Sequence, residues 1–223
     1  MSLNFVFLLI LFAAFCHAGW STIVKKSGNG LAIMAITSII EIIIFLPLVF
    51  TVPLPSTNIW FFIFATTILH GFYRYSVITS YKYGDLSFVY PIARGGSVLI
   101  IGLISLLIIE SNISVLGVIG ILLICFGLFM ISFLTTRKFN RVAFIIAITT
   151  ASLIATYTIL DGMAVRRSEN GFTFIYWMLL LNGIPMLVYA LLSKNGLRKK
   201  NRYNLIDGIV AGILAILGYG LVV

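Results

Sequence analysis

Eight apolar runs, each about as long as a bilayer is thick, determine what this chain can fold into. They cover residues 3–24, 31–52, 58–80, 86–109, 113–135, 141–162, 171–192 and 205–223. A helix needs about 20 predominantly apolar residues to cross the hydrocarbon core. Membrane-spanning strands are excluded because they are shorter and alternate in polarity, whereas these runs are long and continuous. We therefore expect an all-α membrane protein, a polytopic bundle of about eight spanning helices.

Composition indicates the same fold class. Hydrophobic residues make up 61% of the chain and charged residues 9%, against roughly 45–50% and 25% in soluble domains. The net charge of +9 comes from short basic clusters between the apolar runs. This arrangement is typical of loops beside anionic headgroups, so we expect membrane lipid and no nucleic acid as the partner of these charges. Cys16 and Cys125 both fall inside apolar runs, so we expect no disulfide, metal site or cofactor.

The first run shares features with a signal peptide from Phe5 to Phe15. No positive charge precedes it, however, and the apolar pattern continues to Val24, which favours a membrane span over a cleaved leader. Basic residues are concentrated in the loops after runs one, three, five and seven, which places those loops in the cytoplasm and the N-terminus outside. They are Lys25, Lys26, Lys82, Arg137, Lys138, Arg141, Lys194, Arg198, Lys199, Lys200 and Arg202.

A six-residue pattern occurs twice and predicts an internal repeat. Lys-Lys-Ser-Gly-Asn-Gly at 25–30 follows the first run, and Arg-Arg-Ser-Glu-Asn-Gly at 166–171 follows the sixth, an offset of 141 positions (166 − 25). We expect two related parts, residues 1–135 and 141–223. Because an odd number of runs separates the copies, the second part would be inserted upside down, the inverted-repeat plan of many secondary transporters. By the same offset Val223 corresponds to Lys82, so the second part is expected to be two spans short.

The stretch from Tyr81 to Ser97 carries polar groups into the fourth run. Ser87, Tyr90, Arg94 and Ser97 recur at three- and four-residue steps, so they share one helical face. A charged side chain at the centre of a spanning helix costs roughly 2.5–3.5 kcal/mol on insertion scales. Arg94 is therefore expected to face a partner or a water-filled cavity, while the neighbouring glycine pair lets another helix approach closely.

Two motifs carry a resemblance to a known family. The stretch Tyr81–Gly96, with Tyr-Gly-Asp-Leu-Ser and Val-Tyr-Pro-Ile-Ala-Arg-Gly, and His17-Ala18-Gly19-Trp20 in the first run resemble the EamA family of the drug/metabolite transporter superfamily. The resemblance implies ten helices in two five-helix halves, and transport of small metabolites, often export. This chain departs from the pattern by carrying eight runs, the second half being incomplete.

Ionisable side chains in two other runs leave alternatives open. Glu41, in the middle of the second run, either carries a coupling proton or neutralises Arg94 or Arg74. Neutralisation is favoured because an unpaired buried charge is the costlier arrangement. Arg74 follows His70 by one helical turn. The two either form a positive pocket for a carboxylate or phosphate, or Arg74 extends toward the nearer membrane interface.

Further polar and small residues in the apolar runs also have a structural and a functional interpretation. His17 and Trp20 lie on one helical face. Either they contact a ligand together or, as is more common, the tryptophan faces lipid and the histidine has its hydrogen bonds satisfied within the protein. Asp161 matches Trp20 under the repeat offset and is expected at the membrane interface, near the end of its run. Gly208 and Gly212 permit close helix packing, which we interpret as an internal contact; a homodimer stays open.

The sequence thus predicts a secondary transporter that moves a small polar or amphipathic metabolite by alternating access, in the export direction, in a bacterial inner membrane. The candidate substrate-binding residues are Arg94, Tyr90, Arg74, His17, Trp20 and Ser97, and Glu41 is the candidate for proton coupling. No phosphate loop, metal-ligand spacing or nucleophile elbow occurs, so no catalytic residue and no enzyme is expected. The alternative is a non-transporting membrane subunit or truncated remnant that needs a partner to complete the bundle.

Overall fold

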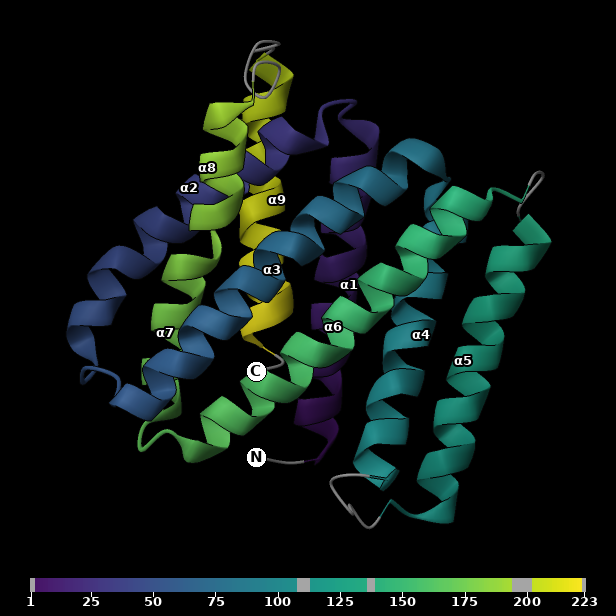
Figure 1. Cartoon of the computed structure of the whole chain (residues 1–223), viewed down its shortest axis with the longest axis horizontal. Coiled ribbons are helices and arrows are strands. Elements are labelled where there is room, and N and C mark those ends of the chain that lie inside the picture. Colours follow the sequence, from purple (N-terminus) through teal and green to yellow (C-terminus); the bar gives the residue numbers. More distant parts are fainter. Residues whose placement is uncertain (1–2, 108–112, 136–138, 194–201, 222–223) are drawn as a thin grey trace. The chain divides into compact units, whose positions relative to one another are not determined.

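The computed structural model describes residues 3–107, 113–135, 139–193 and 202–221, and within these ranges it contains helices and no strand (Figure 1). The predicted all-α fold class is confirmed. The elements are α1 (Leu3–Lys26), α2 (Gly30–Leu48), a 3₁₀ turn η1 (Val49–Thr51), α3 (Thr57–Tyr83), α4 (Leu86–Leu107), α5 (Val115–Thr135), α6 (Arg141–Arg167), α7 (Gly171–Asn182), α8 (Ile184–Leu192) and α9 (Arg202–Gly220).

Seven segments of the described chain are long and apolar enough to cross a membrane. Five are the single helices α1, α3, α4, α5 and α6, and two are composite, α2 with η1 and α7 with α8. Each matches a predicted run to within a few residues. The eighth predicted run is helical too, but its apolar part, Leu205–Gly220, is shorter than the others. An integral multi-pass protein is therefore confirmed, with seven helices of spanning length where eight were expected.

Some predictions fall outside the described residues. These are the ends of the fourth and eighth runs at 108–109 and 222–223, and the basic loop residues Arg137, Lys138, Lys194, Arg198, Lys199 and Lys200.

Large apolar side chains cover the outside of several spans. On α5, Leu116, Leu123 and Phe126 are each more than half exposed. Exposed apolar surface on this scale is unfavourable in water and favourable in hydrocarbon. The surface is therefore that of a protein surrounded by lipid.

The helices form two compact units, which we call unit 1 and unit 2. Unit 1 contains Met1–Arg74 and Leu160–Val223, and unit 2 contains Tyr75–Ile159. Helices α3 and α6 each contribute one end to unit 1 and the other to unit 2. Each unit draws on both sequence parts, 1–135 and 141–223, so the units are not the two repeats, and the inverted repeat stays a prediction.

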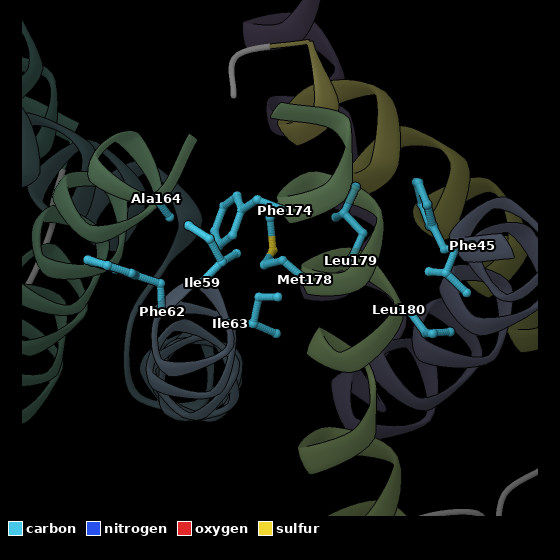
Figure 2. Close-up of a cluster of buried hydrophobic side chains, with 10 residues drawn as sticks. Phe45, Ile59, Phe62, Ile63, Ala164, Phe174, Met178, Leu179 and Leu180 are labelled. Atoms are coloured by element: carbon cyan, nitrogen blue, oxygen red, sulfur yellow. The ribbon is translucent and has the colours of Figure 1, made fainter. Parts of the chain in front are cut away.

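The apolar core of unit 1 is built around α7. Phe174 and Met178 are fully buried and point toward Ile59 and Ile63 of α3, as Figure 2 shows. Leu179 lies on the side of α7 nearer Phe45 of α2. Because lipid tails are as apolar as these side chains, close van der Waals packing, and not release of water, holds the helices together here.

Small residues allow α9 to pack closely on α2 in unit 1. A Cβ placed on Gly208 would lie 2.6 Å from the Cβ of Ile36, and one on Gly212 would lie 3.1 Å from the Cβ of Ile40. Neither site has room for a larger residue without a shift of α2. The predicted internal contact of these two glycines is confirmed.

The two copies of the repeated six-residue pattern form the same kind of joint. In each copy the basic pair occupies the last turn of one helix, α1 or α6. The asparagine then caps the next helix, α2 or α7, where the side chains of Asn29 and Asn170 accept hydrogen bonds from first-turn N–H groups at 3.2 and 3.0 Å. Asparagine is one of the best residues at this position. The copies are therefore equivalent in local structure as well as in sequence.

Candidate functional site

An ion pair between α2 and α3 lies inside unit 1. The Nη2 atom of Arg74 is 2.5 Å from Oε1 of Glu41, and both side chains are buried. Arg74 also donates through Nη1 to the hydroxyl of Ser38 at 3.3 Å. Of the two partners that the sequence left open for Glu41, the structure shows Arg74. The guanidinium turns inward to this carboxylate, so its extension toward a membrane interface is not observed.

A second polar group lies one helical turn earlier on α3. Nε2 of His70 is 3.4 Å from Oδ2 of Asp161 on α6, and the hydroxyl of Tyr219 on α9 donates to the same oxygen. Asp161 is only 1% exposed and His70 only 4%. The carboxylate of Asp161 is thus buried among side chains from two other helices, and its expected depth near the membrane interface stays a prediction.

Aromatic rings connect these polar groups to α1. Trp20 stacks on Tyr73 with ring centroids 6.4 Å apart, and the rings of Tyr73 and His70 pack at a right angle with centroids 6.3 Å apart. His17 packs at a right angle to Trp20, and Tyr219 packs in the same way on His70. Trp20 is buried, so the interpretation of this residue as lipid-facing is wrong.

Several buried polar atoms of unit 1 have no hydrogen-bond partner among the described residues, and four of them lie in or beside the groups described above. They are Nε1 of Trp20, Oγ1 of Thr37, Oε2 of Glu41 and Oδ1 of Asp161. Buried polar atoms in native proteins are nearly always paired, and the exceptions often have a functional explanation. These atoms leave hydrogen-bonding capacity for a solute or for water beside the ion pair, beside the histidine and beside the stacked rings.

The span made of α7 and α8 is interrupted next to the ion pair (Figure 1). Pro185 has no N–H to continue the helix, and α8 begins only after Gly183. A Cβ on Gly183 would lie 2.9 Å from the carbonyl oxygen of Ser38, and a Cβ on Gly71 would lie 2.8 Å from Cβ of Pro185. The break thus fits closely against α2 and α3, at the residue that accepts a hydrogen bond from Arg74.

Unit 2 holds the remaining predicted site residues. The guanidinium of Arg94 lies 5.7 Å from the ring centroid of Tyr90, a cation–π distance. Ser97 is buried and donates to the carbonyl of Arg94 at 2.9 Å. A Cβ on Gly96 would lie 2.9 Å from Cβ of Ala151 on α6, so the predicted close approach at the glycine pair is confirmed.

The structure therefore sorts the candidate residues into two groups. His17, Trp20, Glu41 and Arg74 belong to one cluster in unit 1, which we call the buried cluster, together with Thr37, Ser38, His70, Tyr73, Asp161 and Tyr219. Arg94, Tyr90 and Ser97 gather on α4 in unit 2.

Sequence reasoning missed four members of the buried cluster. Thr37, Ser38 and Tyr73 lie one turn or less from Glu41 or Arg74, so a helical-face argument of the kind applied to Arg94 could have found them. Tyr219 has no such local signal. Within the described ranges, no three side chains of the kinds that bind metals lie close enough to hold an ion.

No protein-family model, no curated protein and no solved structure matches this chain.

Proposed function

We propose that this chain is a secondary transporter that moves a small polar or amphipathic metabolite across the bacterial inner membrane, in the export direction, by alternating access. The observation that carries the proposal is the buried cluster: two carboxylates, an arginine and a histidine held among helices of spanning length. Ionisable groups are costly inside a membrane and are typical of solute pathways, proton relays and ligand sites.

The surroundings of the buried cluster support the same proposal. The break between α7 and α8 is one residue long, at Gly183, which keeps helical dihedral angles (φ −71°, ψ −29°) and lies against Ser38. Breaks in spanning helices are common at substrate sites in transporters. The unpartnered atoms of Trp20 and Thr37 offer hydrogen bonds to a solute. An ion pair needed only for stability would require neither feature.

The proposed roles follow from these contacts and from the resemblance of the motifs to the EamA family. The stacked rings of Trp20 and Tyr73 contact the body of the metabolite, and His17 lines the same face of α1. Arg74 and Glu41 hold the helices in register while they are paired. Arg94, Tyr90 and Ser97, which are grouped by their own contacts on α4 in unit 2, stay proposed as substrate-binding residues.

The proposal is tested by comparing metabolite accumulation in cells with and without the gene, followed by flux of the identified solute in vesicles that contain the purified chain. A Trp20→Phe variant should lower the flux, because it removes the indole N–H and part of the stacking surface. Trp60→Phe is the matched control, since Trp60 packs on Phe64 in the apolar core of unit 1. Absence of any gene-dependent solute movement, or equal loss in both variants, would contradict the proposal.

A further inference from the structure

Helices α3 and α7 of unit 1 meet along a line that two contacts define. At one end, Met178 of α7 faces Ile63 of α3 within the apolar core (Figure 2). At the other end, just beyond the break in the span, a Cβ on Gly71 of α3 would lie 2.8 Å from Cβ of Pro185. Both helices advance along the chain from the first contact to the second, so the positions between them face each other.

Two polar residues, Thr67 and Asn182, occupy these positions. Thr67 follows Ile63 by four residues and Asn182 follows Met178 by four, and residues four apart lie on one face of a helix. The Nδ2 atom of Asn182 donates to Sδ of Met178 at 2.8 Å, so this side chain lies along the same face of α7. Both Thr67 and Asn182 are buried. The interface of α3 and α7 is therefore polar at this point and apolar on one side of it.

The polar atoms of Thr67 and Asn182 are left unused. Oγ1 of Thr67 and Oδ1 of Asn182 have no hydrogen-bond partner among the described residues. The neighbouring Thr66, in contrast, donates to the carbonyl of Ile63 at 3.3 Å. An amide oxygen only accepts hydrogen bonds, whereas a hydroxyl can also donate. Leaving such atoms buried and unpaired costs free energy, so this interface holds capacity for a group from outside the chain.

Helix α2 brings Glu41 to the same level. Phe45 of α2 packs on Tyr176 of α7 with ring centroids 5.8 Å apart, and Ser38 of α2 lies against Gly183 at the end of α7. Glu41 lies between Ser38 and Phe45 in the sequence, so it is level with the last turn of α7. Its Oε2 atom is buried and has no hydrogen-bond partner in the described chain.

The charges at this level favour an uncharged occupant. The other carboxylate oxygen of Glu41 is 2.5 Å from the Arg74 guanidinium, so the pair is neutral as a whole. An added cation would be repelled by Arg74 and an added anion by Glu41, and either would bring an unpaired charge into a buried place. An uncharged group with several N–H or O–H donors satisfies the unused oxygens without adding a charge.

We propose that Glu41, Thr67 and Asn182 form an acceptor subsite, which binds an uncharged donor group of the transported metabolite, either a primary amide or a pair of neighbouring hydroxyls. This inference rests on the proposed transport function and names the class of its substrate. The stacked rings of Trp20 and Tyr73 are proposed to contact the body of that metabolite. A site built of acceptors discriminates strongly against a solute that lacks the donors, because its buried oxygens then stay unpaired.

Four small probes of similar size test the charge and the donors separately. Benzamide is uncharged and has two N–H donors, acetophenone is uncharged and has none, benzylamine is a cation at neutral pH and benzoate is an anion. Binding of each labelled probe to the purified full chain is measured by equilibrium dialysis, with empty detergent micelles as the blank. We expect benzamide to bind at least about tenfold more tightly than each of the other three.

Three substitutions locate the subsite. Thr67→Val and Asn182→Leu replace a polar group by an apolar one of similar shape, so each should weaken benzamide binding at least about tenfold. Each should leave the midpoint of thermal unfolding without probe unchanged or raise it, because an unpaired buried atom is removed. Thr173→Val makes the same change as Thr67→Val at another buried, unpartnered hydroxyl, at the start of α7, and should leave benzamide binding unchanged.

Every other result counts against the subsite. Equal affinity for the four probes, preference for acetophenone or for a charged probe, or binding of none of them would overturn the proposal. So would benzamide binding that both Thr67→Val and Asn182→Leu retain. Where Thr67→Val does not fold, Thr67→Ser, which keeps the hydroxyl and should keep binding, decides together with the probe order of the wild type.

Flux in vesicles separates this inference from the proposed function. If vesicles that contain the chain move a metabolite and its flux is unchanged in Thr67→Val and Asn182→Leu, the transport function stands and the acceptor subsite does not. Absence of all gene-dependent solute movement would remove the transport function itself.

Discussion

Arg74 and Glu41 form an ion pair with only 2.5 Å between Nη2 and Oε1, and both side chains are buried between α2 and α3. The pair joins two helices, and its two residues lie 33 positions apart in the sequence. In the membrane interior each of these charges alone would be costly. The pair therefore fixes how α2 and α3 pack against each other at this point.

Removing one partner of this pair should destabilise the protein strongly. Glu41→Gln leaves the Arg74 guanidinium buried without a counter-ion, so we expect the free energy of unfolding to fall by about 3–5 kcal/mol. Denaturant or thermal unfolding of the purified protein in detergent measures this change. Glu169→Gln, an exposed position in the α6–α7 joint, is the control, with a change within about 0.5 kcal/mol. If the double variant Glu41→Gln/Arg74→Gln loses the full sum of the single losses, the two residues are not coupled.

The break between α7 and α8 should tolerate no side chain at Gly183. Gly183→Ala would bring Cβ to within 3.0 Å of backbone atoms of Ser38, and backbone cannot move aside as a flexible side chain does. We expect a loss of about 1–3 kcal/mol in unfolding free energy. Gly127→Ala on α5 is the matched control, because nothing lies within 4 Å of its Cβ position. Equal stability of the two variants would show that the contact at Ser38 is looser than the structure describes.

The two capping asparagines, Asn29 and Asn170, should contribute equally to the stability of the folded protein. Asn29→Ala and Asn170→Ala each remove a side chain that accepts a hydrogen bond at the start of a helix, so each should lower stability by about 1 kcal/mol. Unfolding of the two single variants and of the double variant measures the effect. A loss at one position only would argue against the equivalence of the repeated six-residue patterns.

The helices and part of the buried cluster could be predicted from sequence because both depend on local patterns. Lengths of apolar runs gave the spans, and the mid-run positions of Glu41 and Arg74 marked them as costly groups that need partners. Which arginine pairs with Glu41 could not be decided, since Arg74 and Arg94 both satisfied that requirement. The structure places Arg74 within reach.

The partners of Asp161 could not be predicted from local sequence patterns. Its partners His70 and Tyr219 lie 91 and 58 positions away in the chain, and no periodicity links positions so distant. Its place near the end of an apolar run suggested the interface; α6 continues to Arg167 and packing encloses the carboxylate. The seventh run was predicted as one continuous span, and the break within it was missed although Gly183 and Pro185, two residues that weaken a helix, are a local signal for it.

Arg94 should matter for flux more than for folding. It is half-buried in unit 2 and packs over Tyr90. We expect Arg94→Ala to abolish substrate flux in vesicles while leaving membrane insertion and elution on size exclusion unchanged. Arg141→Ala, at the exposed start of α6, should leave both unchanged. If Arg94→Ala lowers insertion and flux in parallel, Arg94 has a structural role only.

The claim that water and a small solute reach the buried cluster can be measured most directly by thiol accessibility. In a background without Cys16 and Cys125, the variant Thr37→Cys places a thiol one helical turn from Glu41, at a fully buried position whose hydroxyl has no hydrogen-bond partner in the described chain. The variant Ile39→Cys places a thiol on the same helix, at an exposed position of its apolar face. A charged, membrane-impermeant thiol reagent should modify the first variant from at least one side of the membrane and should spare the second. Protection of Thr37→Cys from both sides, in the presence and absence of solute, would contradict a transport pathway through unit 1.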